Sequence, residues 1–334
     1  MTDTGSAPWI AEQTRTLLAQ RGHAWLLSGP SGLGQYSLAL ALARAWLCEQ
    51  PGAHGACGVC ASCHSVDVRA HADLCVLIPE AVMQTLGWPL SEAAQSDLDD
   101  KKRKPSKEIR VEALRDAVEF AQRTSARGRG KVILVYPAER MNVVSANTLL
   151  KTLEEPAGEL RFVLASEAAH LLLPTIRSRC QNHTMLWPPS EVALTWLRSQ
   201  SVEEAQASVL LRAAGGRPQD ALQYSLSDQE AQVWLKLPRA IVEGNVGVFK
   251  EWSASQVVSA LQKLCHDMMA LSAGADPRFF EATALPAKSP SMATLTVWAG
   301  ALRDSQRTVE HPFNPGLMLE ALVSQAQNAL NSAP

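Results

Sequence analysis

A glycine-rich loop between a predicted strand and a predicted helix constrains the fold of this chain most. The loop Gly29–Ser37 follows the apolar run Ala24–Ser28 and opens an Ala- and Leu-rich helical pattern. In that context, successive backbone N–H groups and the positive end of the helix form a pocket for phosphate oxygens. We therefore expect a phosphate-binding loop with Gly29, Gly32 and Gly34 as its framework.

The same loop lacks the residues that act on a nucleotide. In the pattern G-x-x-x-x-G-K-[ST], Gln35 takes the place of the lysine and Tyr36 the place of the magnesium-binding hydroxyl. A second strand, Val132–Tyr136, should end in a magnesium-binding aspartate, but Tyr136 and Pro137 stand there. We expect a vestigial loop without ATP hydrolysis. Weak nucleotide binding is an open alternative.

Composition narrows the class of protein. The chain has 334 residues, 46% of them hydrophobic, and a net charge of −2, which argues against nucleic-acid binding by bulk charge alone. Its N-terminus shows no targeting pattern, and no uninterrupted apolar run is long enough for a membrane span. We expect a cytoplasmic protein without a membrane partner, in which the seven cysteines are reduced.

Alternating short strands and helices in the first half predict a parallel α/β sheet covered on both faces. The predicted strands are Ala24–Ser28, Leu74–Pro79, Val132–Tyr136, Arg161–Ala165 and Thr184–Trp187. The prolines at 188 and 189 predict a hinge, and the pattern beyond them is helical. The expected domains are an α/β domain at 1–187, a small helical lid at 188–227 and an all-helical C-terminal domain at 228–334.

One polar stretch, residues 91–107, carries neighbouring acidic and basic blocks and no hydrophobic period. A basic arm that touches DNA is one interpretation. A solvated loop is the preferred one, because the opposite charges nearly cancel.

Cysteines form the strongest chemical signal in the chain. Cys57, Cys60 and Cys63 make two overlapping C-x-x-C units, and Cys48 lies a short loop upstream. Four thiolates can close a tetrahedral zinc site, and a full first shell indicates a structural metal. We predict a zinc module at 48–63. A redox dithiol is the weaker alternative, and the fourth ligand is open, with His54, His64 or Cys75 as substitutes for Cys48.

Two further motifs make a family resemblance. They are the run from Ala146 to Pro156, which contains Leu-Leu-Lys-Thr-Leu-Glu-Glu-Pro, and the segment Thr175–Cys180, which contains Ser-Arg-Cys. With the loop and the cysteine cluster, the chain resembles the clamp-loader branch of the AAA+ family over most of residues 20–225. The broken loop favours its delta-prime type, found in bacterial DNA polymerase III, over the ATP-hydrolysing gamma and tau type.

The resemblance implies specific roles. Arg179 falls on the family's arginine finger, which reaches the ATP of a neighbouring subunit. Ser166 falls on the first sensor position, and Gln219 replaces the second sensor arginine. The chain would be a non-catalytic subunit of the polymerase holoenzyme that helps load the sliding clamp onto primer-template DNA, with gamma or tau and delta subunits as partners. The helical C-terminal domain would mediate oligomerisation (a collar). An ATP-hydrolysing motor and a P-loop nucleotide kinase are the alternatives.

Glu154 and Glu155 lie at the predicted C-terminus of a helix, where the negative end of the helix dipole disfavours carboxylates. This placement predicts a basic partner, across a subunit interface, or else a simple exposed helix end.

Overall fold

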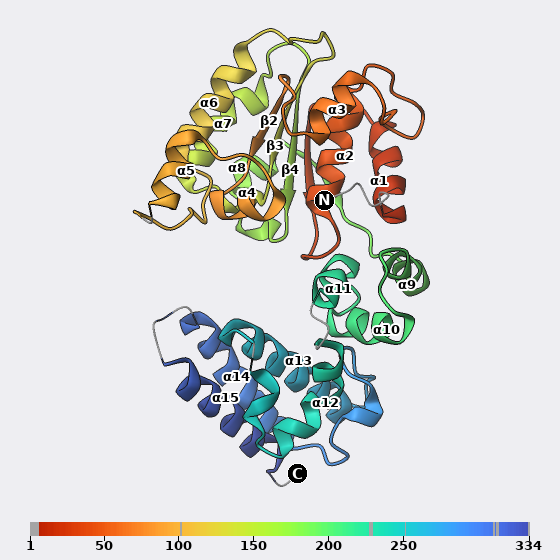
Figure 1. Ribbon diagram of the computed structural model, residues 1–334, viewed down its shortest axis with the longest axis vertical. Coiled ribbons are helices and arrows are strands. Elements are labelled where there is room, and N and C mark those ends of the chain that lie inside the picture. Colours follow the sequence, from red (N-terminus) through yellow and green to blue (C-terminus); the bar gives the residue numbers. More distant parts are fainter. Residues whose placement is uncertain are drawn as a thin grey trace. The chain divides into compact units, whose positions relative to one another are not determined.

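The computed structural model describes residues 7–100, 102–226, 230–250, 252–309, 311 and 314–332. It divides into two compact units with the boundary between Pro188 and Pro189. Each unit is described by itself (Figure 1). Among the described residues no helix is both long and apolar enough to cross a membrane.

The first unit is built on a five-stranded, all-parallel sheet in the order β2-β3-β4-β1-β5. The strands are β1 Ala24–Ser28, β2 Leu74–Leu77, β3 Lys131–Val135, β4 Leu160–Ser166 and β5 Gln181–Thr184. The α/β class with a parallel sheet is therefore confirmed.

Helices cover both faces of this sheet (Figure 1). Helices α6 (Val111–Gln122) and α7 (Val143–Glu154) pack on one face, in a core that includes Ile133 and Phe162. Helix α2 (Gln35–Leu47) packs on the other face, where Leu47 meets Val132. The neighbours Val132 and Ile133 belong to opposite faces because side chains alternate along a strand. This two-sided burial explains why the central strands are mostly apolar.

Shorter helices complete the first unit. They are α1 Pro8–Leu18, α3 Ala61–Asp67, α4 Glu80–Leu86, α5 Glu92–Asp99 and α8 Pro174–Arg177, with 3-10 turns η1 at Ala138–Arg140 and η2 at Ala169–Leu171.

Two local predictions were wrong. The last strand is not Thr184–Trp187 but β5, whose residues are polar and mostly exposed. It is an edge strand paired only with β1, so it shows no apolar run. The stretch 91–107 is not a plain loop, because it contains α5, which is capped by the Ser91 hydroxyl. Arg103 forms ion pairs with Glu80 and Asp97, and Lys102 pairs with Asp100, so these two basic residues have acidic partners within this chain.

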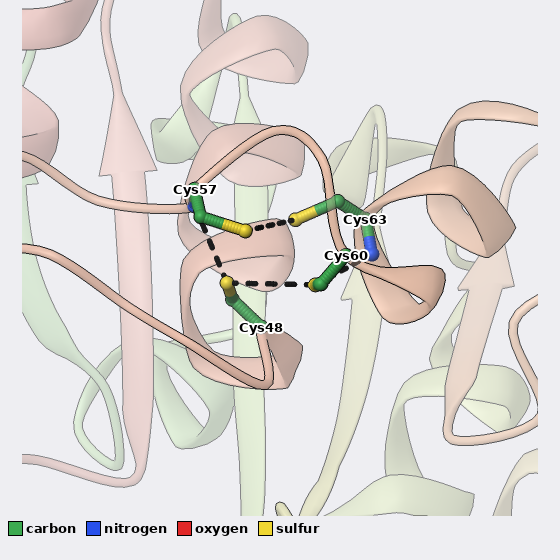
Figure 2. A group of neighbouring side chains, drawn as sticks. All are labelled: Cys48, Cys57, Cys60 and Cys63. Carbon is green, nitrogen blue, oxygen red and sulfur yellow. Dashed lines mark hydrogen bonds between the residues drawn. The ribbon is translucent and has the colours of Figure 1, made fainter.

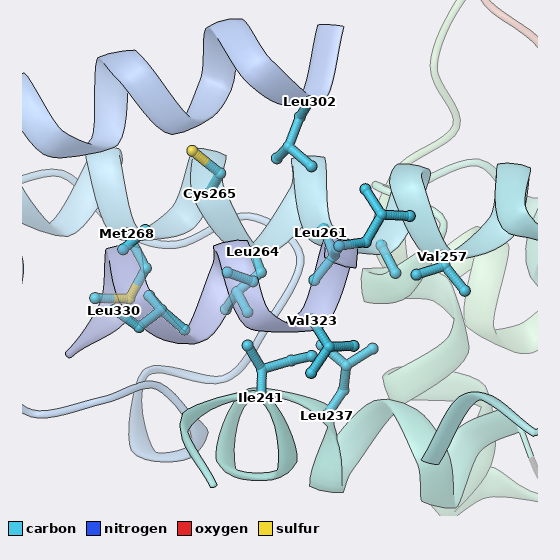
Figure 3. Packing of buried hydrophobic residues seen from close by; sticks show 14 of the residues in the cluster. Leu237, Ile241, Val257, Leu261, Leu264, Cys265, Met268, Leu302, Val323 and Leu330 are labelled. Carbon is cyan, nitrogen blue, oxygen red and sulfur yellow. The ribbon is translucent and has the colours of Figure 1, made fainter. Parts of the chain in front are cut away.

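The second unit is helical. Its helices are α9 Ser190–Ser199, α10 Glu204–Ala213, α11 Pro218–Ser225, α12 Glu230–Val242, α13 Ala254–Ser272, α14 Met292–Thr308 and α15 Pro315–Leu330, with 3-10 turns η3 at Val246–Phe249 and η4 at Ala282–Ala284. Figure 3 shows the core that α12 to α15 share, around Leu237, Leu264 and Leu302. A further division of this unit near residue 227 stays a prediction.

A buried carboxylate fixes the loop after α13. Asp267, which is 0% exposed, accepts hydrogen bonds from the backbone N–H groups of Arg278, Phe279 and Phe280 at 2.9, 2.7 and 2.8 Å. Trp234 stacks on the ring of Phe280, with ring centroids 4.7 Å apart. Asp267 therefore positions an aromatic residue of the core, and the cost of burying its charge is offset by three donors.

We expect Asp267→Ala to destabilise the second unit by about 3 kcal/mol, because three buried N–H groups lose their acceptor. Urea denaturation measures the loss, and amide hydrogen exchange at residues 278–280 locates it. Asp304→Ala is the control, since the Asp304 side chain is 78% exposed and pairs only with Arg307 in the part of the chain that is described. Equal stability of the two variants would contradict this role of Asp267.

Candidate functional site

The glycine-rich loop is bridged by its own glutamine. Gly34, with φ of 96°, precedes Gln35, the first residue of α2. The Gln35 side chain is buried, and its Nε2 donates hydrogen bonds to the carbonyl oxygens of Gly29 and Pro30 at 2.7 and 2.6 Å. Both protons of the amide nitrogen are thus used inside the loop. A lysine at this place would direct its charge at phosphate oxygens. The Gln35 amide instead donates to carbonyl oxygens of its own loop.

Two tyrosines occupy the positions of the expected magnesium ligands. The rings of Tyr36 and Tyr136 lie 5.4 Å apart between centroids, and Trp88 Nε1 donates to the Tyr36 hydroxyl at 2.6 Å. Burial raises the pKa of Tyr36, so its phenol is neutral near pH 7. The Tyr136 hydroxyl donates to Glu167 Oε1 at 2.8 Å. A neutral phenol is a poor magnesium ligand, since this ion prefers carboxylates and phosphates.

The other polar groups at the carboxyl edge of the sheet bind backbone. Ser166 Oγ accepts from the N–H of Ala168 at 3.2 Å, and Glu139 Oε1 accepts from the N–H of Glu167 at 3.1 Å. Gly29 N–H donates to the Ser166 carbonyl at 3.3 Å and joins the loop to β4. These contacts tie Ser166, Glu139 Oε1 and Gly29 to the backbone, whereas the buried Glu139 Oε2 has no hydrogen-bond partner among the described residues.

Arg179 lies at the amino end of the strands, whereas the loop lies at their carboxyl end. β5 runs parallel to β1, with Trp25 opposite Gln181 and Ser28 opposite Thr184. Arg179 comes before β5, whereas the loop comes after β1, so the length of the strands separates them. This arginine is therefore not directed at its own chain's loop. Its side chain is 31% exposed and pairs with Glu154, the last residue of α7.

Arg179 is the basic partner of Glu154, one of the two carboxylates at the C-terminus of α7 for which the sequence predicted such a partner. The basic partner is in the same chain, and it offsets the unfavourable helix dipole. An ion pair this exposed is worth between about 0.2 and 1 kcal/mol, so its contribution to the stability of the fold is small.

Figure 2 shows the four cysteines converging on one point. Their Sγ atoms all lie within 4.8 Å of one another, with 3.8 Å between Cys48 and Cys60 and 4.0 Å between Cys57 and Cys63. A tetrahedral zinc site with Zn–S bonds of about 2.3 Å requires S–S edges of about 3.8 Å. The cluster therefore has the donor set and the spacing to hold a metal ion, with Cys48 as the fourth sulfur.

Backbone geometry prepares this cluster. Cys48 ends α2, and Cys60 caps α3, where its Sγ accepts from the Cys63 N–H at 3.4 Å. Burial works to raise the pKa of Cys60, but hydrogen bonds from the backbone of Cys63 and Glu49 outweigh it and lower that pKa to about 6. Burial raises the pKa of Cys63 to about 12. A bound cation would be needed to keep a thiolate at that buried position.

Residues that the sequence did not single out fasten the cluster to the sheet. The buried Ser62 hydroxyl lies 2.6 Å from His71 Nε2, and His71 Nδ1 accepts from the Asp73 N–H at 3.0 Å. The Asp73 carboxylate in turn accepts from the N–H groups of Ala126 and Arg127. These contacts join α3 to β2 and to the loop before β3. Their side chains carry no motif and meet only in the folded chain.

Gln219, the predicted replacement for the second sensor, is the second residue of α11. Its neighbour Arg217 forms an ion pair with Asp220, with 2.6 Å between Nε and Oδ2. Arg217 is therefore bound within its own helix turn.

Comparisons with known proteins agree with this architecture. The family model described as "DNA polymerase III, delta subunit" matches residues 12–186. DNA polymerase III subunit delta' of Pseudomonas aeruginosa is 39% identical over 64% of this chain and 60% of its own length. The subunit delta' of Escherichia coli is 36% identical over 64% of this chain and 59% of its own length. The chain thus matches about three-fifths of these relatives' length.

A solved structure supports the fold alone. A DNA polymerase III gamma subunit-related protein of Thermotoga maritima superposes with a TM-score of 0.52 at 15% identity, covering 96% of this chain and 99% of that one. The family model and the relatives together show that this chain belongs to the DNA polymerase III delta' family.

Proposed function

We propose that this chain is a non-hydrolysing clamp-loader subunit that helps load a sliding clamp onto primed DNA. Its partners would be delta and gamma or tau subunits, and through the assembly it would meet the clamp and the primer-template DNA. The observation that carries the proposal is the loop bridged by Gln35, in a chain of the DNA polymerase III delta' family. The lid at 188–227 and the collar at 228–334 belong to the same proposal.

The state of the loop argues against the two alternatives. An ATP-driven motor and a nucleotide kinase both need a cation at the loop and a magnesium ion held by a hydroxyl and a carboxylate. Here the corresponding positions hold the neutral side chains of Gln35, Tyr36 and Tyr136, which contact the loop, Trp88 and Glu167. ATP would have to displace these contacts, and none of the three side chains carries a positive charge.

Arg179 would supply the chemistry that this chain contributes. It precedes β5 at the amino end of the strands, whereas its own loop lies at the carboxyl end of β1. This placement suits action on an ATP held by a neighbouring subunit. There its guanidinium would stabilise charge on the transferring phosphoryl group, an effect worth roughly 10³–10⁵ in rate for comparable arginine fingers. Arg179 would act in trans, while its own chain stays catalytically silent.

The four cysteines would hold a structural zinc ion. Their sulfurs match the edges of a tetrahedron, and the insert they close, residues 48–63, contributes only Cys48 and Cys63 to the buried hydrophobic core among its described residues. Zinc would fix this insert to the end of α2, which packs on one face of the sheet. With all four ligand positions taken by protein, the metal would have no open site for a substrate.

We expect the purified chain to contain about one zinc ion, measured by atomic emission. Cys60→Ser should lower the zinc affinity by more than about 100-fold, because loss of a ligand exceeds the effect of changes around the ligands. Cys265→Ser is the matched control, since that buried thiol lies in the second unit and donates to the Leu295 carbonyl, as a serine also can. A metal-free, fully folded wild-type chain would refute the zinc proposal.

The role of Arg179 is tested in a ring where only the subunit next to this chain keeps its phosphate-loop lysine. Arg179→Ala should reduce the clamp- and DNA-stimulated ATPase of that ring by roughly 10³-fold or more. Arg177→Ala, an exposed arginine two residues earlier, should leave the rate near the wild-type value. Equal rates for Arg179→Ala and wild type would remove the finger from the account.

A further inference from the structure

Arg179 is held on more than one side within its own chain. Its Nε lies 2.5 Å from Glu154 Oε1, and its Nη2 forms the ion pair with the same oxygen. Its Nη1 donates to the Thr175 carbonyl at 2.8 Å and lies 3.4 Å from Ser178 Oγ. Glu154 therefore binds the Nε–Nη2 edge of the guanidinium, and a backbone carbonyl of α8 accepts a hydrogen bond from Nη1.

These contacts leave donor capacity on the outer side of the plane. A guanidinium carries five N–H donors in a fixed fork. Glu154 takes one hydrogen from Nε and one from Nη2, and Thr175 takes one from Nη1. The second Nη1 hydrogen makes only the long contact to Ser178 Oγ, and Nη2 has one further hydrogen. The contact to Ser178 is long, and a charged oxygen would compete with it easily. Nη1 and Nη2 lie side by side at the end of the guanidinium, so this end can present donors to a phosphate.

Glu154 reaches this place because of two independent elements. It is the last residue of α7, which packs against α8, and Arg179 follows the end of α8 by two residues. Thr175, which supplies the second contact, lies on α8 itself. Fixing a flexible side chain by two rigid helices lowers the conformational entropy lost when it engages a ligand.

We propose that Glu154 is a positioning residue: it holds Arg179 by its Nε edge and aims the Nη edge out of the chain toward a neighbour's triphosphate. The inference rests on the proposed function of Arg179 and adds to it a second residue, through which the finger is oriented. An exposed ion pair contributes little to folding, so the effect of Glu154 should be seen in the rate and not in stability.

The test uses the assembled ring in which only the subunit next to this chain can hydrolyse ATP, with clamp and primed DNA. Glu154→Ala should lower kcat about 10-fold at unchanged KM and unchanged affinity of the chain for the ring, because the finger is misplaced and binding surfaces are kept. In Glu154→Gln, kcat should fall by no more than about 3-fold, because the glutamine amide oxygen still accepts a hydrogen bond from Nε, though a weaker one. Glu155→Ala, the exposed neighbour, should match wild type.

The outcomes separate the inference from the function on which it rests. If Arg179→Ala loses activity and Glu154→Ala does not, the positioning role is overturned and the finger stands. If Glu154→Ala is faster than wild type, the carboxylate restrains the arginine, and the inference is again overturned. If Arg179→Ala itself keeps full activity, the proposed finger fails and the inference fails with it. A loss in Glu154→Ala with recovery in Glu154→Gln supports positioning.

Discussion

The interpretation of this structure depends on the hydrogen bonds from the Gln35 amide to two carbonyl oxygens of its own loop. They preserve the strand–loop–helix turn that shapes the carboxyl edge of the sheet, and they do so with a neutral group. In a nucleotide-binding loop the turn is completed by charge interacting with phosphate. Here the Gln35 amide makes these contacts within the loop, so the turn is held by hydrogen bonds of the chain itself.

Around that loop, two tyrosines stand where a nucleotide-hydrolysing loop has magnesium ligands. Tyr36 and Tyr136 contact each other, and their hydroxyls bond to Trp88 and Glu167. The same sheet carries Arg179 at the opposite end of its strands, before β5. The architecture therefore separates the end of the sheet with the glycine-rich loop from the end that presents an arginine. The cysteine cluster, at the junction of α2 and α3, is tied through Ser62, His71 and Asp73 to the segments that precede β2 and β3, at the amino ends of the strands.

Much of this could be predicted from the sequence, because the signals were local. The glycine loop, the substitutions at Gln35 and Tyr36 and the closely spaced cysteines each lie within a few residues. Contacts between distant segments could not be predicted. Glu154 and Arg179 are 25 positions apart, and Trp88 and Tyr36 are 52 apart. The edge strand β5 was missed because its residues are polar, and α5 was missed because its stretch of the chain lacks an apolar period.

The central claim, that the loop has become scaffold, is tested most directly by titrating the isolated chain with MgATP and following both binding heat and turnover. The account predicts a Kd weaker than about 1 mM and no hydrolysis above background. It further predicts that Gln35→Lys alone does not create a working site, because Tyr36 and Tyr136 still occupy the positions of the metal ligands. Micromolar binding with turnover by the wild-type chain would contradict it.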